Sequence, residues 1–152
     1  MDFNNSILLQ ADDFYEAYLR CIEGKNKKVK GNTTSWSVVN IPAVVNASFA
    51  CELYFKSLIG KELKSHNLIG FYNKLSRDIK NELQEHYKYK KVGDCKTICQ
   101  AINEVKNTFV EWRYLYKDEF KEQCNPKDLN RFLWIFATIT PILKEVAHTH
   151  SS

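Results

Sequence analysis

The sequence predicts an all-α fold, an antiparallel up-and-down bundle of four long helices with one or two short ones. Apolar residues recur at spacings of three and four along most of the chain, as they do on the buried face of a helix. Only 5 Gly and 3 Pro occur among the 152 residues, so turn signals are sparse. No segment shows the alternation that is typical of a half-buried strand. The length fits one domain, which we expect to span residues 1–147.

The first predicted helix runs from about Phe3 to Glu23, because apolar residues form a stripe along one side of it. The stripe consists of Ile7, Ala11, Phe14, Tyr18 and Cys21. Residues 24–37 follow and are rich in Lys, Asn, Thr, Ser and Gly. This composition predicts a mobile basic loop.

The second predicted helix runs from Asn40 to Ile59. Asn40 is a favourable N-cap, and Pro42 is tolerated in the first turn. The segment is apolar almost all round, which is typical of a helix enclosed by others. Glu52 and Lys56 interrupt its apolar surface without forming a polar face.

Four more helices are expected after the second one. The segment HNLIGFYNKLS predicts a short helix, and Ser76 is expected to cap the helix that follows. Asp94 is expected to cap a long helix that continues to about Phe120. The last helix should begin with Pro126 at its first position, and we expect residues 148–152 to form a frayed tail.

The chain is mildly basic, with 22 Lys and Arg residues against 18 Asp and Glu residues and a net charge of +4. Such a balance does not by itself indicate a nucleic-acid-binding protein. The lysines, however, gather in GKNKKVKG and YKYKK. Either these stretches are solvated loops, or they contact the phosphates of an RNA. The candidate RNA-binding residues are Lys25, Lys27, Lys28, Lys30, Lys88, Lys90 and Lys91.

The five cysteines are expected to be buried free thiols, because their odd number and irregular spacing do not indicate a disulfide framework. Cys95 and Cys99 would share a helix face and supply half of a metal site, but no His or Cys pair at matching spacing completes it. We therefore expect neither a metal nor a cofactor. No apolar run reaches the ~20 residues of a membrane span, and the acidic N-terminal stretch is unlike a signal peptide. The predicted location is the cytoplasm, without membrane association.

The segment FVEWRYLYKDEF places Arg113 among aromatic residues, at the edge of an apolar stripe rather than on a polar side. A charge buried there needs a partner, and a guanidinium can hold a carboxylate with two hydrogen bonds. We therefore expect an interior polar cluster made of Glu52, Lys56, Arg113 and Tyr116. The cluster either fixes the register of the helices as an ion pair or forms part of a functional site.

Three segments resemble the bacterial and archaeal HEPN domains, in the order that the family shows and within about residues 40–120. They are NIPAVVNASFACELYFKSLI, HNLIGFYNKLS and FVEWRYLYKDEF. The resemblance implies a helical bundle that often forms a homodimer. It also implies a role in RNA-directed defence, such as toxin–antitoxin or abortive-infection systems, with an RNA, a cognate antitoxin or a nuclease as the partner.

The chain departs from the family in its catalytic motif, an Arg followed by four to six residues and then a His. Arg113 is followed at that spacing by Asp118, Glu119 and Phe120. The remaining catalytic candidates are Arg113 and His66. For His66 the alternative is a local role, either capping the next helix or holding a turn.

The sequence therefore predicts a non-canonical HEPN protein that binds RNA or a partner protein through a dimer groove and the basic loops. Two alternatives stay open. One is a structural adaptor or dimerisation module without nucleic-acid activity. The other is a regulatory bundle that binds a nucleotide or a small ligand between its helices.

Overall fold

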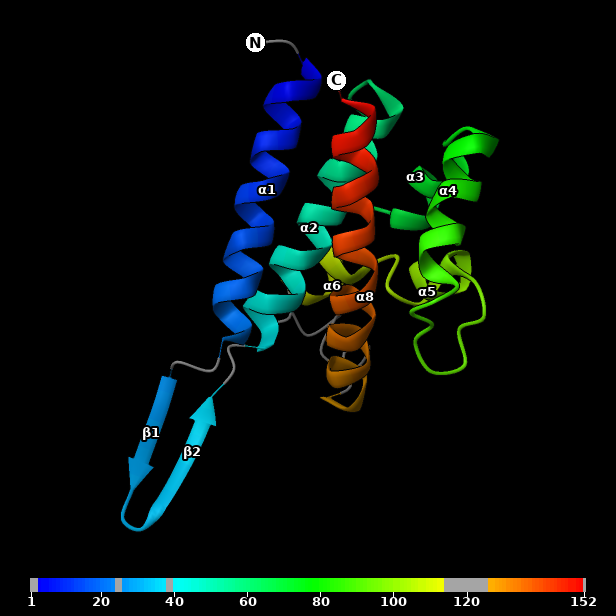
Figure 1. The fold of residues 1–152 in the computed structure, drawn as a ribbon. Helices are drawn as coiled ribbons and strands as arrows, with labels where there is room; N and C mark the ends of the chain where they lie inside the picture. The colour runs from blue at the N-terminus through cyan, green and yellow to red at the C-terminus, as the bar shows by residue number, and fades with distance from the viewer. Residues whose placement is uncertain (1–2, 24–25, 38–39, 114–125, 152) are drawn as a thin grey trace.

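The structure is a helical bundle that carries one β-hairpin (Figure 1). The computed structural model describes residues 3–23, 26–37, 40–113 and 126–151, and of residues 3, 26–30, 33–37 and 126–127 it describes the backbone alone. The elements in chain order are α1 (Phe3–Ile22), β1 (Asn26–Lys30), β2 (Thr33–Ser37), α2 (Asn40–Ile59), α3 (Leu68–Asn73), α4 (Arg77–Tyr87), α5 (Ile98–Glu104), α6 (Thr108–Arg113) and α8 (Pro126–His150). The predicted helical class is confirmed. None of the described helices combines the length and the apolarity of a membrane span.

The central helix of the bundle is α2, which packs against α1, α3, α6 and α8. Figure 1 shows α1 and α2 side by side and antiparallel, whereas α8 contacts α2 and runs in the same direction as α2. The shorter α4 packs against α8 as well. The almost uniformly apolar surface of α2 follows from this enclosed position.

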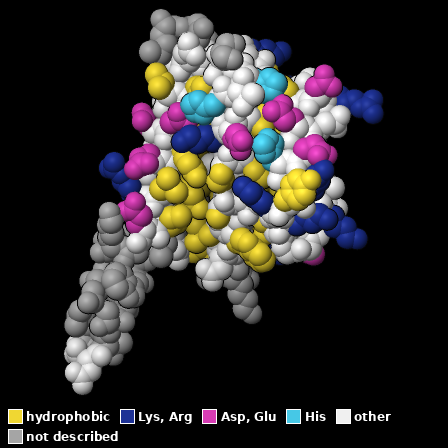
Figure 2. Space-filling model, viewed as in Figure 1, with side chains coloured by type: hydrophobic (Ala, Val, Ile, Leu, Met, Phe, Trp, Pro, Cys, Tyr) yellow, Lys and Arg dark blue, Asp and Glu magenta, His cyan; other side chains and the backbone are white. Residues whose placement is uncertain are grey.

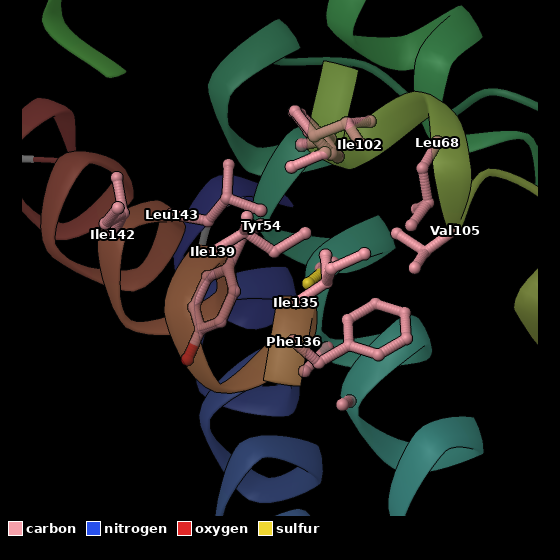
Figure 3. Packing of buried hydrophobic residues seen from close by; sticks show 14 of the residues in the cluster. Tyr54, Leu68, Ile102, Val105, Ile135, Phe136, Ile139, Ile142 and Leu143 are labelled. Carbon is pink, nitrogen blue, oxygen red and sulfur yellow. The ribbon is translucent and has the colours of Figure 1, made fainter. Parts of the chain in front are cut away.

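One hydrophobic core joins α2, α3, α5 and α8 (Figure 3). Its labelled members are all almost fully buried: Tyr54, Leu68, Ile102, Val105, Ile135, Phe136, Ile139, Ile142 and Leu143. Burying one large apolar side chain of this kind contributes about 1.5–3 kcal/mol relative to leaving it exposed. The apolar core therefore holds α2 firmly in place, together with the polar residues that it carries.

Several element boundaries match the sequence prediction. The helices α1 and α2 begin and end within one residue of their expected limits. The Ser76 side chain caps α4 by accepting a hydrogen bond from the Ile79 N–H, and α8 begins at Pro126. In each case a helix start or stop signal coincides with the end of an apolar stripe.

The mobile loop predicted for residues 24–37 is wrong for residues 26–37, which form an antiparallel hairpin. The strands pair from Asn26 with Ser37 to Lys30 with Thr33. Gly31 adopts a φ of +63°, which suits a two-residue hairpin turn. The composition-based prediction overlooked the β-branched and aromatic residues among positions 29–36, which favour strands. Figure 1 shows the hairpin projecting beyond the ends of α1 and α2.

The long helix predicted from Asp94 to Phe120 is also wrong at its start. Thr97 caps α5, and its side chain forms a reciprocal capping box with Gln100. Asp94 instead accepts a hydrogen bond from Arg131 of α8 at 2.7 Å. The capping box sets the start of α5 because it satisfies the free N–H groups of the first turn.

The same predicted helix is interrupted between α5 and α6. The Val105 N–H bonds to the Ile102 carbonyl at 3.2 Å, and the Thr108 hydroxyl donates to the Val105 carbonyl at 2.8 Å. Such tight turns and side-chain bonds to the backbone compete with a continuous helix. Residues 114–125, which include Tyr116, lie outside the described residues.

The tail predicted to fray at residues 148–152 is helical up to His150. The Nε2 atom of His148 lies 2.9 Å from an Asp12 carboxylate oxygen, and Nε2 of His150 lies 2.7 Å from a Glu82 oxygen. These contacts tie the end of α8 to α1 and to α4. The prediction considered only the polar composition of the tail and not the acidic residues that face it.

Candidate functional site

The most unusual polar residue of the core is Glu52, which is completely buried in α2. One of its carboxylate oxygens lies 3.4 Å from the Lys56 ammonium, one helical turn further along. The other oxygen lies 2.6 Å from Nδ1 of His66. Both oxygens of Glu52 therefore have a partner, as a buried carboxylate requires. The predicted neighbours Glu52 and Lys56 do lie together inside the bundle.

His66 reaches Glu52 because the chain reverses after α2. Gly60 ends that helix with a φ of +82°, a conformation that a glycine adopts without strain. The Leu68 N–H then bonds to the Lys106 carbonyl at 3.0 Å, which fixes the end of the connection. Asn67 caps α3, because its side chain accepts from two N–H groups of the first turn. The predicted capping role of His66 is therefore wrong, and its imidazole contacts Glu52 instead.

The imidazole of His66 is half-buried, with 42% of the side chain exposed, whereas the Glu52 side chain is only 1% exposed. A carboxylate bound to Nδ1 holds the ring in one orientation and favours the tautomer with the proton on Nδ1. In that tautomer Nε2 is the nitrogen that can accept a proton. The arrangement thus presents an oriented histidine at the surface, supported by a buried acid.

Arg113 lies near the same histidine through a shared aromatic ring. The guanidinium carbon of Arg113 is 4.4 Å from the centre of the Phe109 ring, one turn earlier in α6. The His66 ring centre lies 4.9 Å from the centre of that same ring. Phe109 is itself stacked on Phe49 of α2 at 4.8 Å. Both catalytic candidates named from the sequence therefore contact the Phe109 ring, which is stacked on Phe49.

The structure corrects the predicted buried pair between Arg113 and Glu52. Arg113 is exposed, and the partners that bind Glu52 are Lys56 and His66. The long Arg113 side chain reaches solvent over the Phe109 ring. An Arg aligned with apolar residues on a helical wheel thus marks the edge of the core in this case.

A second polar cluster lies at the start of the α5 region and involves Asp94, Cys95 and Glu104, whose ligand atoms all lie within 4.8 Å of one another. The Arg131 guanidinium donates to both carboxylates. It lowers the pKa of the Asp94 and Glu104 carboxyl groups, while burial raises the pKa of the Cys95 thiol. A cation could bind there only by displacing Arg131, so the geometry fits an ion-pair cluster better than a metal centre.

A groove of about 640 Å³ lies between α1 and α8, and it is lined by Tyr15, Pro141, Lys144, Glu145, His148 and Thr149. Figure 2 shows apolar side chains gathered over this part of the molecule. The His148 imidazole in the groove is bound to Asp12, which also accepts a hydrogen bond from the Tyr54 hydroxyl at 2.6 Å. Burial, with that hydrogen bond, raises the pKa of Tyr54. Both groups thus serve the packing of α1, α2 and α8, and we place the candidate site at His66.

The candidate RNA-binding lysines fall into two places. Lys88, Lys90 and Lys91 are exposed on the connection between α4 and α5. The second group contains Lys27, Lys28 and Lys30, which belong to strand β1. Lys25 lies outside the described residues.

Comparison of the chain with protein-family models, with curated proteins and with solved structures gives no match. The candidate site accordingly rests on geometry and on the sequence resemblance. Sequence reasoning named His66, Arg113, Glu52 and Lys56, but it missed the hydrogen bond between Glu52 and His66 and the shared ring of Phe109. The bond joins residues 14 positions apart, so no helical spacing signals it.

Proposed function

We propose that this chain is a HEPN-like domain that acts on RNA and cleaves it at His66. The observation that carries the proposal is the 2.6 Å contact between buried Glu52 and half-exposed His66, next to the exposed guanidinium of Arg113. The resemblance to HEPN domains supports it, because the three matching segments supply α2 with Glu52, the connection with His66, and α6 with Arg113. In this proposal the four-helix arrangement of the family is formed by α1, α2, α4 and α8.

The reaction that fits this site is attack by the ribose 2′-hydroxyl on the neighbouring phosphate. Nε2 of His66 takes the proton of the 2′-hydroxyl as a general base. A bond forms between the 2′-oxygen and phosphorus while the bond to the 5′-oxygen breaks. The leaving 5′-oxygen takes a proton from water, and the products carry a 2′,3′-cyclic phosphate and a 5′-hydroxyl.

Glu52 and Lys56 would act as positioning residues in this reaction. Glu52 orients the His66 ring and stabilises the imidazolium that forms when the proton is transferred. Lys56 balances the carboxylate with a positive charge, so the pair is neutral before His66 gains its proton. Arg113 would bind the phosphate and stabilise the charge that develops in the transition state.

Cleavage of a labelled single-stranded RNA tests the proposal. His66→Gln keeps a polar side chain but cannot act as a base, and we expect it to lower the cleavage rate by about 10²- to 10⁴-fold. Arg113→Ala should lower the rate while leaving the fold intact, because Arg113 is exposed. His150→Gln is the matched control, since the His150 side chain is equally exposed (42%) and likewise contacts a carboxylate, that of Glu82.

The chemistry of the product provides an independent readout. An RNA whose 2′-hydroxyl at the cut position is replaced by hydrogen should resist cleavage, and the normal product should carry the cyclic phosphate. A wild-type protein that leaves RNA intact would contradict the cleavage, as would a His66→Gln variant that cuts at the wild-type rate. In either case Glu52 and His66 would only serve to hold the connection after α2.

We also propose that the chain forms a homodimer through the apolar surface over α1 and α8, which Figure 2 shows. Tyr15 of α1 and Pro141 of α8 line a groove in this surface. Light scattering should give twice the monomer mass of 17.8 kDa. Ala137→Glu puts a charge at an exposed position one turn before Pro141 and should yield the monomer. A wild-type monomer at tens of micromolar would contradict the dimer.

A further inference from the structure

Two exposed aromatic side chains stand beside a run of lysines at the base of α4. Tyr89 is 81% exposed and Trp134 of α8 is 54% exposed, although both are large apolar side chains. Lys88, Lys90 and Lys91 surround Tyr89 in the sequence and are exposed as well. We name these five residues the aromatic–lysine patch. Figure 2 shows dark blue and yellow side chains together over this connection between α4 and α5.

Trp134 belongs to the same surface as the lysine run because it lies against Gly93. A Cβ atom built on Gly93 would be 3.9 Å from the Trp134 ring and 3.4 Å from Arg131, so the glycine leaves room for both side chains. Arg131 in turn binds Asp94 at 2.7 Å. The connection between α4 and α5 is therefore bound to α8. Tyr89 and Gly93 are four residues apart, so their Cα atoms lie at most about 14 Å from each other.

Tyr89 presents an open ring that core packing does not require. The Lys88 ammonium lies 5.0 Å from its ring centre. The Tyr89 side chain also lines a hollow of about 420 Å³ together with Glu82, Glu85, His86 and Lys90. The Glu85 carboxylate is paired with Lys88, and Glu82 is paired with His150. Both acids near the ring thus already have a cationic or imidazole partner.

The charge of the patch favours a polyanion over a protein partner. Residues 88–96 contain four lysines and a single acidic residue, Asp94, which Arg131 binds. Lysines are depleted at the centres of protein–protein interfaces. Aromatic rings interleaved with lysines are instead typical of surfaces that stack successive bases and contact the phosphates between them.

We infer that the aromatic–lysine patch binds single-stranded RNA by stacking bases on Tyr89 and Trp134 while Lys88, Lys90 and Lys91 contact its phosphates. This inference rests on the proposed action on RNA and adds its substrate class, an unpaired strand. A duplex keeps its bases stacked on one another and offers no free base faces to the two rings. The patch therefore selects single strands by their accessible bases and not by their sequence.

The test measures binding of an unpaired RNA probe of about 12 nucleotides, a length within the range that such surfaces contact, and of the same strand in a duplex. Trp134→Ala and Tyr89→Ala should each weaken single-strand binding by about 5- to 100-fold, the loss expected for one stacked base. Trp134→Phe retains an aromatic face and should restore most of the affinity. Trp134 fluorescence should be quenched when the probe binds.

The lysines are tested by the salt dependence of the same binding. Lys90→Ser with Lys91→Ser should reduce the slope of log affinity against log salt by about 1.4, since each phosphate contact on a single strand contributes about 0.7. Lys61→Ser with Lys74→Ser removes the same charge from exposed positions outside the patch and is the matched control. It should leave the slope close to the wild-type value.

The outcomes separate this inference from the proposed cleavage. Normal single-strand affinity in Trp134→Ala and Tyr89→Ala, or equal affinity for the duplex, would overturn the patch even if His66→Gln abolishes cleavage. Conversely, loss of binding in these variants supports the patch even if the wild type never cuts the RNA. A Trp134→Ala variant that binds RNA normally but has a different oligomeric state by light scattering would show that the patch is a contact between proteins, and the inference would be wrong.

Discussion

The stability of this fold should depend strongly on the balance of charge around Glu52. Its side chain is 1% exposed, and the Lys56 side chain, which supplies the opposite charge at 3.4 Å, is 10% exposed. Lys56→Met keeps most of the side-chain length and the contact with the neighbouring Phe71 ring, whose centre lies 5.9 Å from the Lys56 ammonium. It leaves the buried carboxylate with His66 alone. Breaking one side of such a pair typically costs about 3–5 kcal/mol of the free energy of unfolding.

Urea denaturation followed by circular dichroism measures this cost, and a parallel thermal scan should show a melting temperature lower by about 6–20 °C. Glu52→Gln combined with Lys56→Met removes both charges. We expect it to cost less than the sum of the single changes, because neither charge is left uncompensated. Lys74→Met, at an exposed position, is the control and should change stability by less than about 0.5 kcal/mol.

A small loss of stability in Lys56→Met, below about 1 kcal/mol, together with additive single and double changes, would contradict this prediction. That result would mean that the buried Glu52 carboxylate does not need Lys56 as a partner. Arg113→Ala distinguishes the two possible partners of Glu52. Because the Arg113 side chain is exposed over Phe109 and does not bind Glu52, its loss should cost less than the loss of Lys56.

Two further predictions follow from the ionisable groups. Arg131 lowers the pKa of Asp94 and Glu104, so its contribution to the free energy of unfolding should be complete above the unfolded pKa values of about 4 and be lost as the pH falls through the lowered ones. The stability difference between wild type and Arg131→Met, measured from pH 7 to pH 2, should therefore shrink only at the acidic end. A difference that shrinks already between pH 7 and 5 would contradict this prediction. Burial raises the pKa of the Cys51 thiol to about 12, and the Thr140 hydroxyl lies 3.2 Å from its sulfur. Iodoacetamide at pH 8 should therefore leave Cys51 unmodified in the native protein and alkylate it in urea, which peptide mass spectrometry can show. Rapid modification of the native protein would mean that α2 and α8 open locally.

The sequence predicts those parts of the fold in which a local signal and an apolar stripe agree. The stripe of α1 and the enclosed surface of α2 locate both helices, and the Ser76 hydroxyl marks the start of α4. The hairpin at residues 26–37 was missed because its lysines resemble a solvated loop, although Val29 and Trp36 favour strands. The interruption after Glu104 was missed because the apolar stripe continues through it, whereas the turn depends on hydrogen bonds of single residues.

The candidate site shows the limit of reasoning from single helices. A helical wheel aligns Arg113 with the core, but its long side chain lies over the Phe109 ring and reaches solvent. The buried carboxylate of Glu52 is bound by Lys56 and His66 instead. Lys56 is one turn away and was foreseeable, whereas His66 becomes a partner only because Gly60 reverses the chain.

Glu52 is bound by His66 and Lys56 and not by Arg113. In the structure the acid instead supports an imidazole that is 42% exposed, and the guanidinium lies at the surface over the ring that the imidazole also contacts. His66 precedes Arg113 by 47 positions in the chain, and both side chains contact the Phe109 ring. The tertiary fold brings them to that ring, and no spacing in the sequence signals it.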